Sequence, residues 1–60
     1  MNKQRAQEIT QSADLIQVLY DGKPIYIQHV NENNDTARVY PLDDPEHEFE
    51  VNLENLVEKH

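Results

Sequence analysis

The chain has 60 residues, no cysteine and a net charge of −7 at neutral pH. A chain this short forms at most one small domain, predicted over residues 1–60, and buries only about 60% of its unfolded surface, so we expect marginal stability. Disulfides and thiolate metal sites are excluded, and no apolar run approaches the roughly 18 residues of a membrane span. The polar N-terminal sequence is unlike a secretion signal, which favours a protein without membrane contact that stays inside the cell.

The acidic residues are distributed unevenly along the chain. Charges in residues 1–30 cancel, whereas residues 31–60 hold nine acidic residues against two basic ones. Binding to nucleic acid depends on neutralising phosphates with Lys and Arg, so this composition disfavours DNA as a partner. The acidic half is most simply a solvated surface. A docking site for an unknown basic protein partner is the alternative interpretation.

The first predicted element is a short helix over residues 1–13. Asn2 is expected to cap it, because an Asn side chain accepts a hydrogen bond from a free amide of the first turn. Most of the following residues are good helix formers, and Ala6 and Ile9 lie on one weakly apolar stripe. A helix this short needs to dock on the rest of the protein to persist.

Residues 15–58 are predicted to form a β domain. Alternating apolar residues predict strands over residues 15–20, 23–30, 36–42 and 48–53. Asp21 and Gly22 predict a two-residue hairpin loop between the first two strands, since both residues tolerate positive φ. Leucines at helical spacing in residues 53–57 predict a closing helical turn after the last strand.

The inward faces of these elements supply a candidate core. Its predicted members are Ile9, Ile16, Val18, Tyr20, Ile25, Ile27, Val39, Phe49, Val51, Leu53 and Leu56. On the second strand, strict alternation places His29 on the same face as Ile25 and Ile27. Such a core is thin, and self-association could reinforce it.

This succession of elements predicts a mainly β (α+β) fold. A short N-terminal helix is followed by a small four-stranded antiparallel sheet of the SH3-like barrel type, with a short C-terminal helical turn. An open four-stranded meander with one packed helix is the alternative architecture.

The sequence offers little for catalysis or metal binding. The three histidines are 18 and 13 residues apart, unlike the short ligand spacings of zinc sites. The acidic residues 43–48 lack the ligand pattern and the glycine of a calcium loop. Exposed carboxylates lack the burial that general acid–base catalysis needs, and we expect too little room for a ligand cleft of about 300–1,000 Å³. The prediction is a non-enzymatic protein with no catalytic residue, cofactor or metal.

Aromatic residues support an alternative function. Tyr26 and Tyr40 are expected to be cross-strand neighbours on one face, where their rings could stack on bases, with Lys23 and Arg38 assisting. Cross-strand aromatic pairs also stabilise sheets without binding anything, and the acidic charge argues against stacking. A homodimer formed through an edge strand and residues 41–45 is a further alternative.

Nearly the whole chain resembles a known family. The opening MNKQRAQEI and the run GKPIYIQHVNENNDTARVYPLDDPEHEFEVNLENLVE are similar to the H-type small acid-soluble spore proteins of spore-forming Firmicutes. The most specific part is PIYIQHV followed by TARVYPL. The chain departs from the family pattern at Ser12-Ala13, where Ser-Pro is frequent, and at Leu19, where Thr is frequent.

The resemblance implies a role in sporulation. It implies a protein that is made in the forespore, stored in the spore core and lost at germination, with no known catalytic residue. The α/β-type spore proteins that coat DNA share the name but have a different sequence pattern, so their function does not carry over. We therefore expect a structural or interaction module of the spore core (the forespore cytoplasm).

Overall fold

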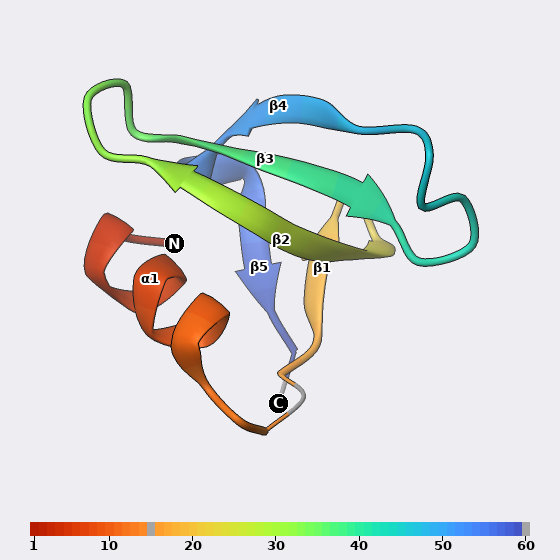
Figure 1. Ribbon diagram of the computed structural model, residues 1–60, viewed down its shortest axis with the longest axis horizontal. Helices are drawn as coiled ribbons and strands as arrows, with labels where there is room; N and C mark the ends of the chain where they lie inside the picture. The colour runs from red at the N-terminus through yellow and green to blue at the C-terminus, as the bar shows by residue number, and fades with distance from the viewer. Residues whose placement is uncertain (15, 60) are drawn as a thin grey trace.

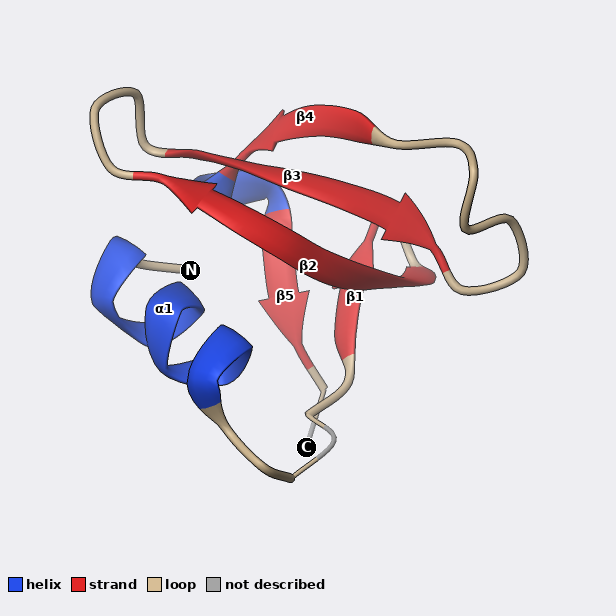
Figure 2. Cartoon of the chain, in the orientation of Figure 1, coloured by secondary structure: helices blue, strands red, loops and turns tan. Residues whose placement is uncertain are grey.

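The computed structural model describes residues 1–14 and 16–59, which form a short α-helix and a five-stranded antiparallel sheet (Figures 1 and 2). The elements in chain order are α1 (Lys3–Gln11), β1 (Val18–Tyr20), β2 (Lys23–Asn31), β3 (Thr36–Pro41), β4 (Phe49–Asn52), the 3₁₀ helix η1 (Leu53–Asn55) and β5 (Leu56–Glu58). The strand order is β4-β3-β2-β1-β5. Figure 1 shows β1 and β5 turned steeply across the long β2–β3 hairpin, so the sheet curls into a half-barrel. The predicted mainly β fold with an N-terminal helix is confirmed.

The sheet has five strands, whereas the sequence predicts four. The additional strand, β5, pairs antiparallel with β1 and places Val57 opposite Leu19. The helical turn predicted over residues 53–57 is a single turn of 3₁₀ helix that leads directly into β5. Three residues are too few to show a strand pattern, and only the open edge of β1 makes them a strand.

The helix begins as expected but ends earlier. Asn2 caps it, because the Asn2 Oδ1 atom accepts a hydrogen bond from the Arg5 amide at 2.7 Å. Ser12 already has extended backbone, with ψ of 140°, so the helix does not reach residue 13. Within the described residues, no helix is long and apolar enough to cross a membrane.

The β1–β2 hairpin has the predicted two-residue loop. Asp21 and Gly22 have φ of 54° and 77°, and Tyr20 lies opposite Lys23 in the register. Two successive residues with positive φ suit the twist of a tight hairpin. The preceding strand begins at Val18 rather than at residue 15, and the prediction for Leu15 lies outside the described residues.

A β-bulge in β2 changes which residues enter the core. Ile27 lies opposite Val39, but the next pair is His29 with Arg38, so Gln28 is the extra residue. A bulge shifts the alternation by one residue. Val30 is therefore buried and His29 is exposed, and the prediction that His29 shares the face of the buried isoleucines is wrong.

The core lies inside the half-barrel, between the sheet and α1. Its buried hydrophobic residues are Ala6, Val18, Ile25, Ile27, Val30, Ala37, Val39, Val51, Leu53 and Leu56. Three of them, Ala6, Val30 and Ala37, are absent from the predicted core. Four predicted members are only half-buried at its margin: Ile9, Ile16, Tyr20 and Phe49. α1 packs on β2, with Ala6 fully buried.

Polar contacts attach α1 to the C-terminal part of the chain. The N-terminal ammonium of Met1 donates to the backbone carbonyls of Leu53 and Leu56, at 3.1 and 3.4 Å. Figure 1 shows the N-terminus between α1 and the sheet. The Arg5 guanidinium donates two hydrogen bonds to the Glu58 carboxylate, at 2.6 and 2.9 Å. The helix is therefore tied to both η1 and β5.

Candidate functional site

The two tyrosines predicted as neighbours do form a cross-strand pair. Tyr26 on β2 lies opposite Tyr40 on β3, with the ring centroids 5.3 Å apart and 31° between the ring planes. Tyr26 is 44% exposed, and Tyr40 is half-buried. The outer face of the sheet thus carries a small aromatic platform.

Arg38, the cation next to this platform, already forms an ion pair. Arg38 shares the outer face with Tyr40 because residues two apart on a strand point the same way. Its Nε atom donates to the Glu48 carboxylate at 2.9 Å, and Glu50 lies opposite it in the β3–β4 register. These two glutamates neutralise the positive charge of Arg38, which a phosphate group would need for binding.

A separate hollow of about 530 Å³ lies at one end of the half-barrel, and we call it the aromatic groove. It is lined by the β1–β2 hairpin, the end of β3 and the segment before β4: Tyr20, Asp21, Lys23, Pro24, Ile25, Pro41, Leu42, Asp43, His47 and Phe49. Strand alternation places Lys23 on the opposite face of β2 from Tyr26. The structure therefore brings Tyr26, Tyr40 and Arg38 together and places Lys23 elsewhere.

Three rings form the centre of the aromatic groove. Phe49 contacts Tyr20, with centroids 5.6 Å apart and planes at 59°, and also His47, at 5.7 Å and 56°. Tyr20 and Phe49 are half-buried, whereas His47 is exposed. Tilted rings of this kind present both faces and edges to a ligand, and ring faces attract cations.

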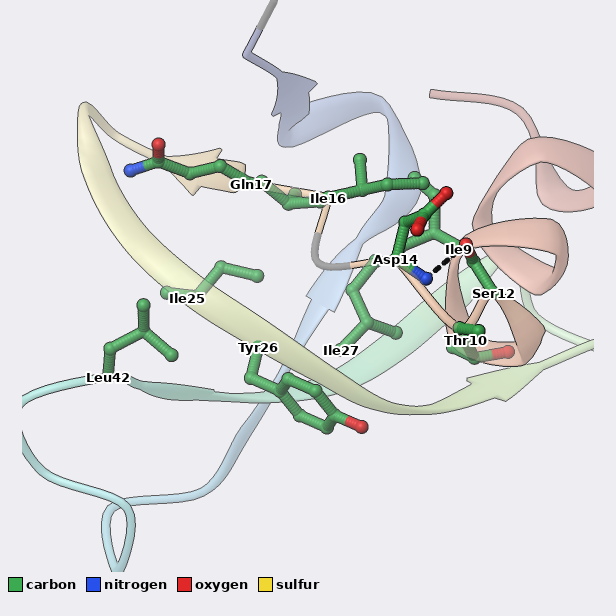
Figure 3. Close-up of a pocket in the computed structure, with 12 residues that line it drawn as sticks. Ile9, Thr10, Ser12, Asp14, Ile16, Gln17, Ile25, Tyr26, Ile27 and Leu42 are labelled. Atoms are coloured by element: carbon green, nitrogen blue, oxygen red, sulfur yellow. Dashed lines mark hydrogen bonds between the residues drawn. The ribbon is translucent and has the colours of Figure 1, made fainter.

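A second groove, of about 500 Å³, lies between the end of α1 and β2 (Figure 3). Its apolar lining includes Ile9, Ile16, Ile25 and Ile27. Leu42 lies at the end away from α1 (Figure 3). Near the helix, the Asp14 amide donates to the Ser12 hydroxyl oxygen at 3.1 Å. With two grooves of this size on the surface, the expectation of too little room for a ligand cleft is wrong.

The histidines stand apart from one another. His29 is exposed on β2 and His47 contacts Phe49, while His60 lies outside the described residues. Among residues 1–14 and 16–59, no three His, Cys, Asp or Glu side chains gather where they could hold a metal ion.

The aromatic groove is the feature that the sequence analysis missed. Its rings and prolines come from three segments, and only the curl of the sheet brings Tyr20 on β1 against Phe49 on β4. The sequence did contain one indication: alternation predicts that both aromatics point inward at the ends of their strands. A residue at the end of a strand is only half covered by the core.

Comparison with known proteins agrees with the motifs noted in the sequence. The profile of the Small acid-soluble spore protein H family matches residues 1–58. Proteins named "Small, acid-soluble spore protein H" from Bacillus licheniformis and Bacillus subtilis are each 60% identical over 58 residues, covering 97% of this chain and 98% of the relative. A protein of the same name from Halalkalibacterium halodurans is 57% identical over 58 residues, covering 97% of each chain. No solved structure matches the chain. The chain belongs to the small acid-soluble spore protein H family.

Proposed function

We propose that this protein is a non-enzymatic structural or interaction module of the spore core, made in the forespore. Membership of a spore-protein family carries the proposal, because it assigns the chain a role in the spore. The relatives' names state no reaction, substrate or cofactor.

The surface supports an interaction role. Tyr26 and Leu42 are 44% and 48% exposed, and the rings of the aromatic groove are partly uncovered. Aromatic and apolar groups that are held on a β scaffold and rimmed by charge are typical of protein interaction sites.

The test follows the protein through sporulation with an antiserum against the purified chain. We expect it to be absent from growing cells, to appear after the forespore forms, and to remain in spores whose coats have been removed. Equal amounts in growing cells, or loss together with the coat fraction, would contradict the proposal. An antiserum against a constitutive cytoplasmic protein controls for recovery.

Nucleic-acid binding is the second candidate function, because Tyr26 and Tyr40 form a partly exposed platform. We expect any binding to be weak and to disappear in moderate salt, since Arg38 is paired with Glu48. Fluorescence anisotropy with a labelled single-stranded oligonucleotide tests this at low salt, comparing the wild type with Tyr26→Leu. The absence of binding at high micromolar protein would end this candidate.

Two finer structural expectations accompany the proposal. We infer an SH3-like barrel as the fold class of the curled sheet, whose edge strands β4 and β5 each pair with one neighbour in the described residues.

A homodimer through an edge strand and residues 41–45 would cover Leu42, which is 48% exposed. Sedimentation that shows a monomer at millimolar concentration would remove the dimer.

A further inference from the structure

We infer that the aromatic groove binds an extended peptide segment of a partner protein and that an arginine of this peptide enters the groove. This inference rests on the proposed interaction function and names the kind of partner. Two features of the groove support it: its rings, and two carboxylates that form no ion pair with a described residue.

The rings provide a surface that suits a guanidinium group. Phe49 stands between Tyr20 and His47, with both neighbouring ring planes tilted by more than 50° from its own. A planar guanidinium stacks on such faces and is less strongly hydrated than an ammonium group. Pro41 and Leu42 add apolar walls that would contact the methylenes of the arginine side chain.

Two carboxylates line the groove beside Lys23, and no Lys, Arg or His of the described residues forms an ion pair with either. Asp21 and Asp43 make no hydrogen bond or ion pair through their side chains with any other described residue. By contrast, Arg38 pairs with Glu48 at 2.9 Å. Arginine binds carboxylates through two parallel hydrogen bonds.

Local structure holds the backbone at both acids. Asp21 lies in the tight β1–β2 turn with φ of 54°. Asp43 lies in a loop in which the Asp44 amide donates to the Pro41 carbonyl at 3.1 Å and the His47 amide donates to the Asp44 carbonyl at 3.0 Å. A preorganised site loses less conformational entropy when a ligand binds.

Charge favours a peptide of a separate protein as the ligand of the aromatic groove over nucleic acid or a second copy of this chain. Nucleic acid is a polyanion and would meet both acids. A second copy of this chain also carries −7, and its two arginines, Arg5 and Arg38, are already held by Glu58 and Glu48. A separate chain with an uncompensated arginine fits the groove better than either.

The test is a titration of the ¹⁵N-labelled full chain with three matched eight-residue peptides of Ala and Pro. They differ only at a central residue, which is Arg, Lys or citrulline, the neutral isostere of arginine. We expect amide shifts at Tyr20, Lys23, His47 and Phe49 with the Arg peptide, weaker binding of the Lys peptide, and about tenfold weaker binding of the citrulline peptide.

Variants of exposed residues locate the site without disturbing the core. Asp21→Asn with Asp43→Asn should weaken the Arg peptide by about threefold to tenfold, because two exposed ion pairs are lost; Asn also tolerates positive φ at position 21. Glu8→Gln with Glu54→Gln changes the net charge equally, away from the groove, and should have little effect. Lys23→Gln removes the only Lys or Arg among the described lining residues and should tighten binding.

Several outcomes would overturn the inference. Equal weakening by the two double variants would show only general attraction to an acidic protein. The inference would also be wrong if the amide shifts centred on Tyr26 and Tyr40, or if the citrulline peptide bound as tightly as the Arg peptide. It would be wrong as well if the groove shifts followed the concentration of protein instead of the concentration of peptide. A lack of peptide binding leaves the spore-core proposal standing, because that proposal is decided by where the protein is found.

Discussion

Gly22 occupies a backbone conformation that most residues avoid. Its φ is 77°, and it follows Asp21, whose φ is 54°. A Cβ atom built on Gly22 would meet nothing within 4 Å. Any cost of a larger residue at this position therefore comes from the backbone conformation and not from a clash.

Gly22→Ala should lower the free energy of unfolding by about 1–2 kcal/mol, the cost of a left-handed conformation for an ordinary residue. Gly22→Asn is the matched control and should cost less, since the short Asn side chain tolerates this region. Chemical denaturation of the three proteins measures the difference. If Gly22→Ala were as stable as the wild type, the turn would have changed to a conformation that alanine adopts without strain.

Single residues also show where prediction from sequence succeeded. The Asn2 cap and the hairpin at Asp21-Gly22 were predictable because each depends on the local chemistry of a few neighbouring residues. The side-chain direction of His29 was not predictable, since strict alternation fails wherever a bulge inserts an extra residue.

The bulge in β2 is the decisive feature at the scale of elements. The extra residue, Gln28, separates the Ile27–Val39 pair from the His29–Arg38 pair. It allows both ends of one long strand to contribute to the core, Ile27 before the bulge and Val30 after it. A one-residue change of register would exchange buried and exposed side chains on one side of this point.

Deleting both Gln28 and His29 should therefore lower the free energy of unfolding by roughly 3 kcal/mol or more, because Val30 would then follow Ile27 directly, lose its burial and leave Asn31 to turn inward. Gln28→Ala keeps the chain length and is the control, with a much smaller expected effect. Thermal denaturation monitored by circular dichroism compares them. A deletion variant as stable as Gln28→Ala would mean that the strand does not depend on this register.

The attachment of α1 depends on the Arg5–Glu58 pair. Glu58 raises the pKa of Arg5 above its ordinary value, first through the side-chain hydrogen bond. Because the folded pKa is the higher one, the contribution of the charged guanidinium is fully present at every pH below the ordinary pKa of arginine. It is lost only as the pH rises through the raised value. Titration of Arg5 therefore does not release the helix at any physiological pH.

Arg5→Met should lower the melting temperature, and Arg5→Lys should recover only part of the loss, because an ammonium group cannot reproduce the two parallel hydrogen bonds. Hydrogen exchange should locate the loss in α1 and β5. A double-mutant cycle with Glu58→Gln isolates the pair. A coupling energy of zero would show that the Arg5–Glu58 pair does not hold the helix.

The whole molecule has little stability to lose. At roughly 0.05–0.15 kcal/mol per residue, a chain of this length is stable by about 3–9 kcal/mol. All ten buried hydrophobic residues in the described part belong to one cluster. Damage to that cluster should therefore affect the cooperative unfolding of the entire sheet.

Ile27→Ala should cost about 2–5 kcal/mol, because Ile27 is 3% exposed and its truncation leaves a cavity. Val57→Ala is the control: Val57 is 60% exposed, and the change should alter stability by no more than about 0.5 kcal/mol. Urea denaturation at 25 °C measures both. Equal effects would place the cooperative core elsewhere.

The sequence by itself determined the features that depend on neighbouring residues and on composition: the capped helix, the β1–β2 hairpin, the alternating strands, the acidic charge and the family motifs. Tertiary structure alone decided the fifth strand, the bulge at Gln28 and the aromatic groove. The physical reason is the distance along the chain between the residues that stabilise each feature. A cap or a tight turn is stabilised within a few residues. Leu56–Glu58 becomes a strand only because β1 offers an unpaired edge, and Tyr20 meets Phe49 only because the sheet curls.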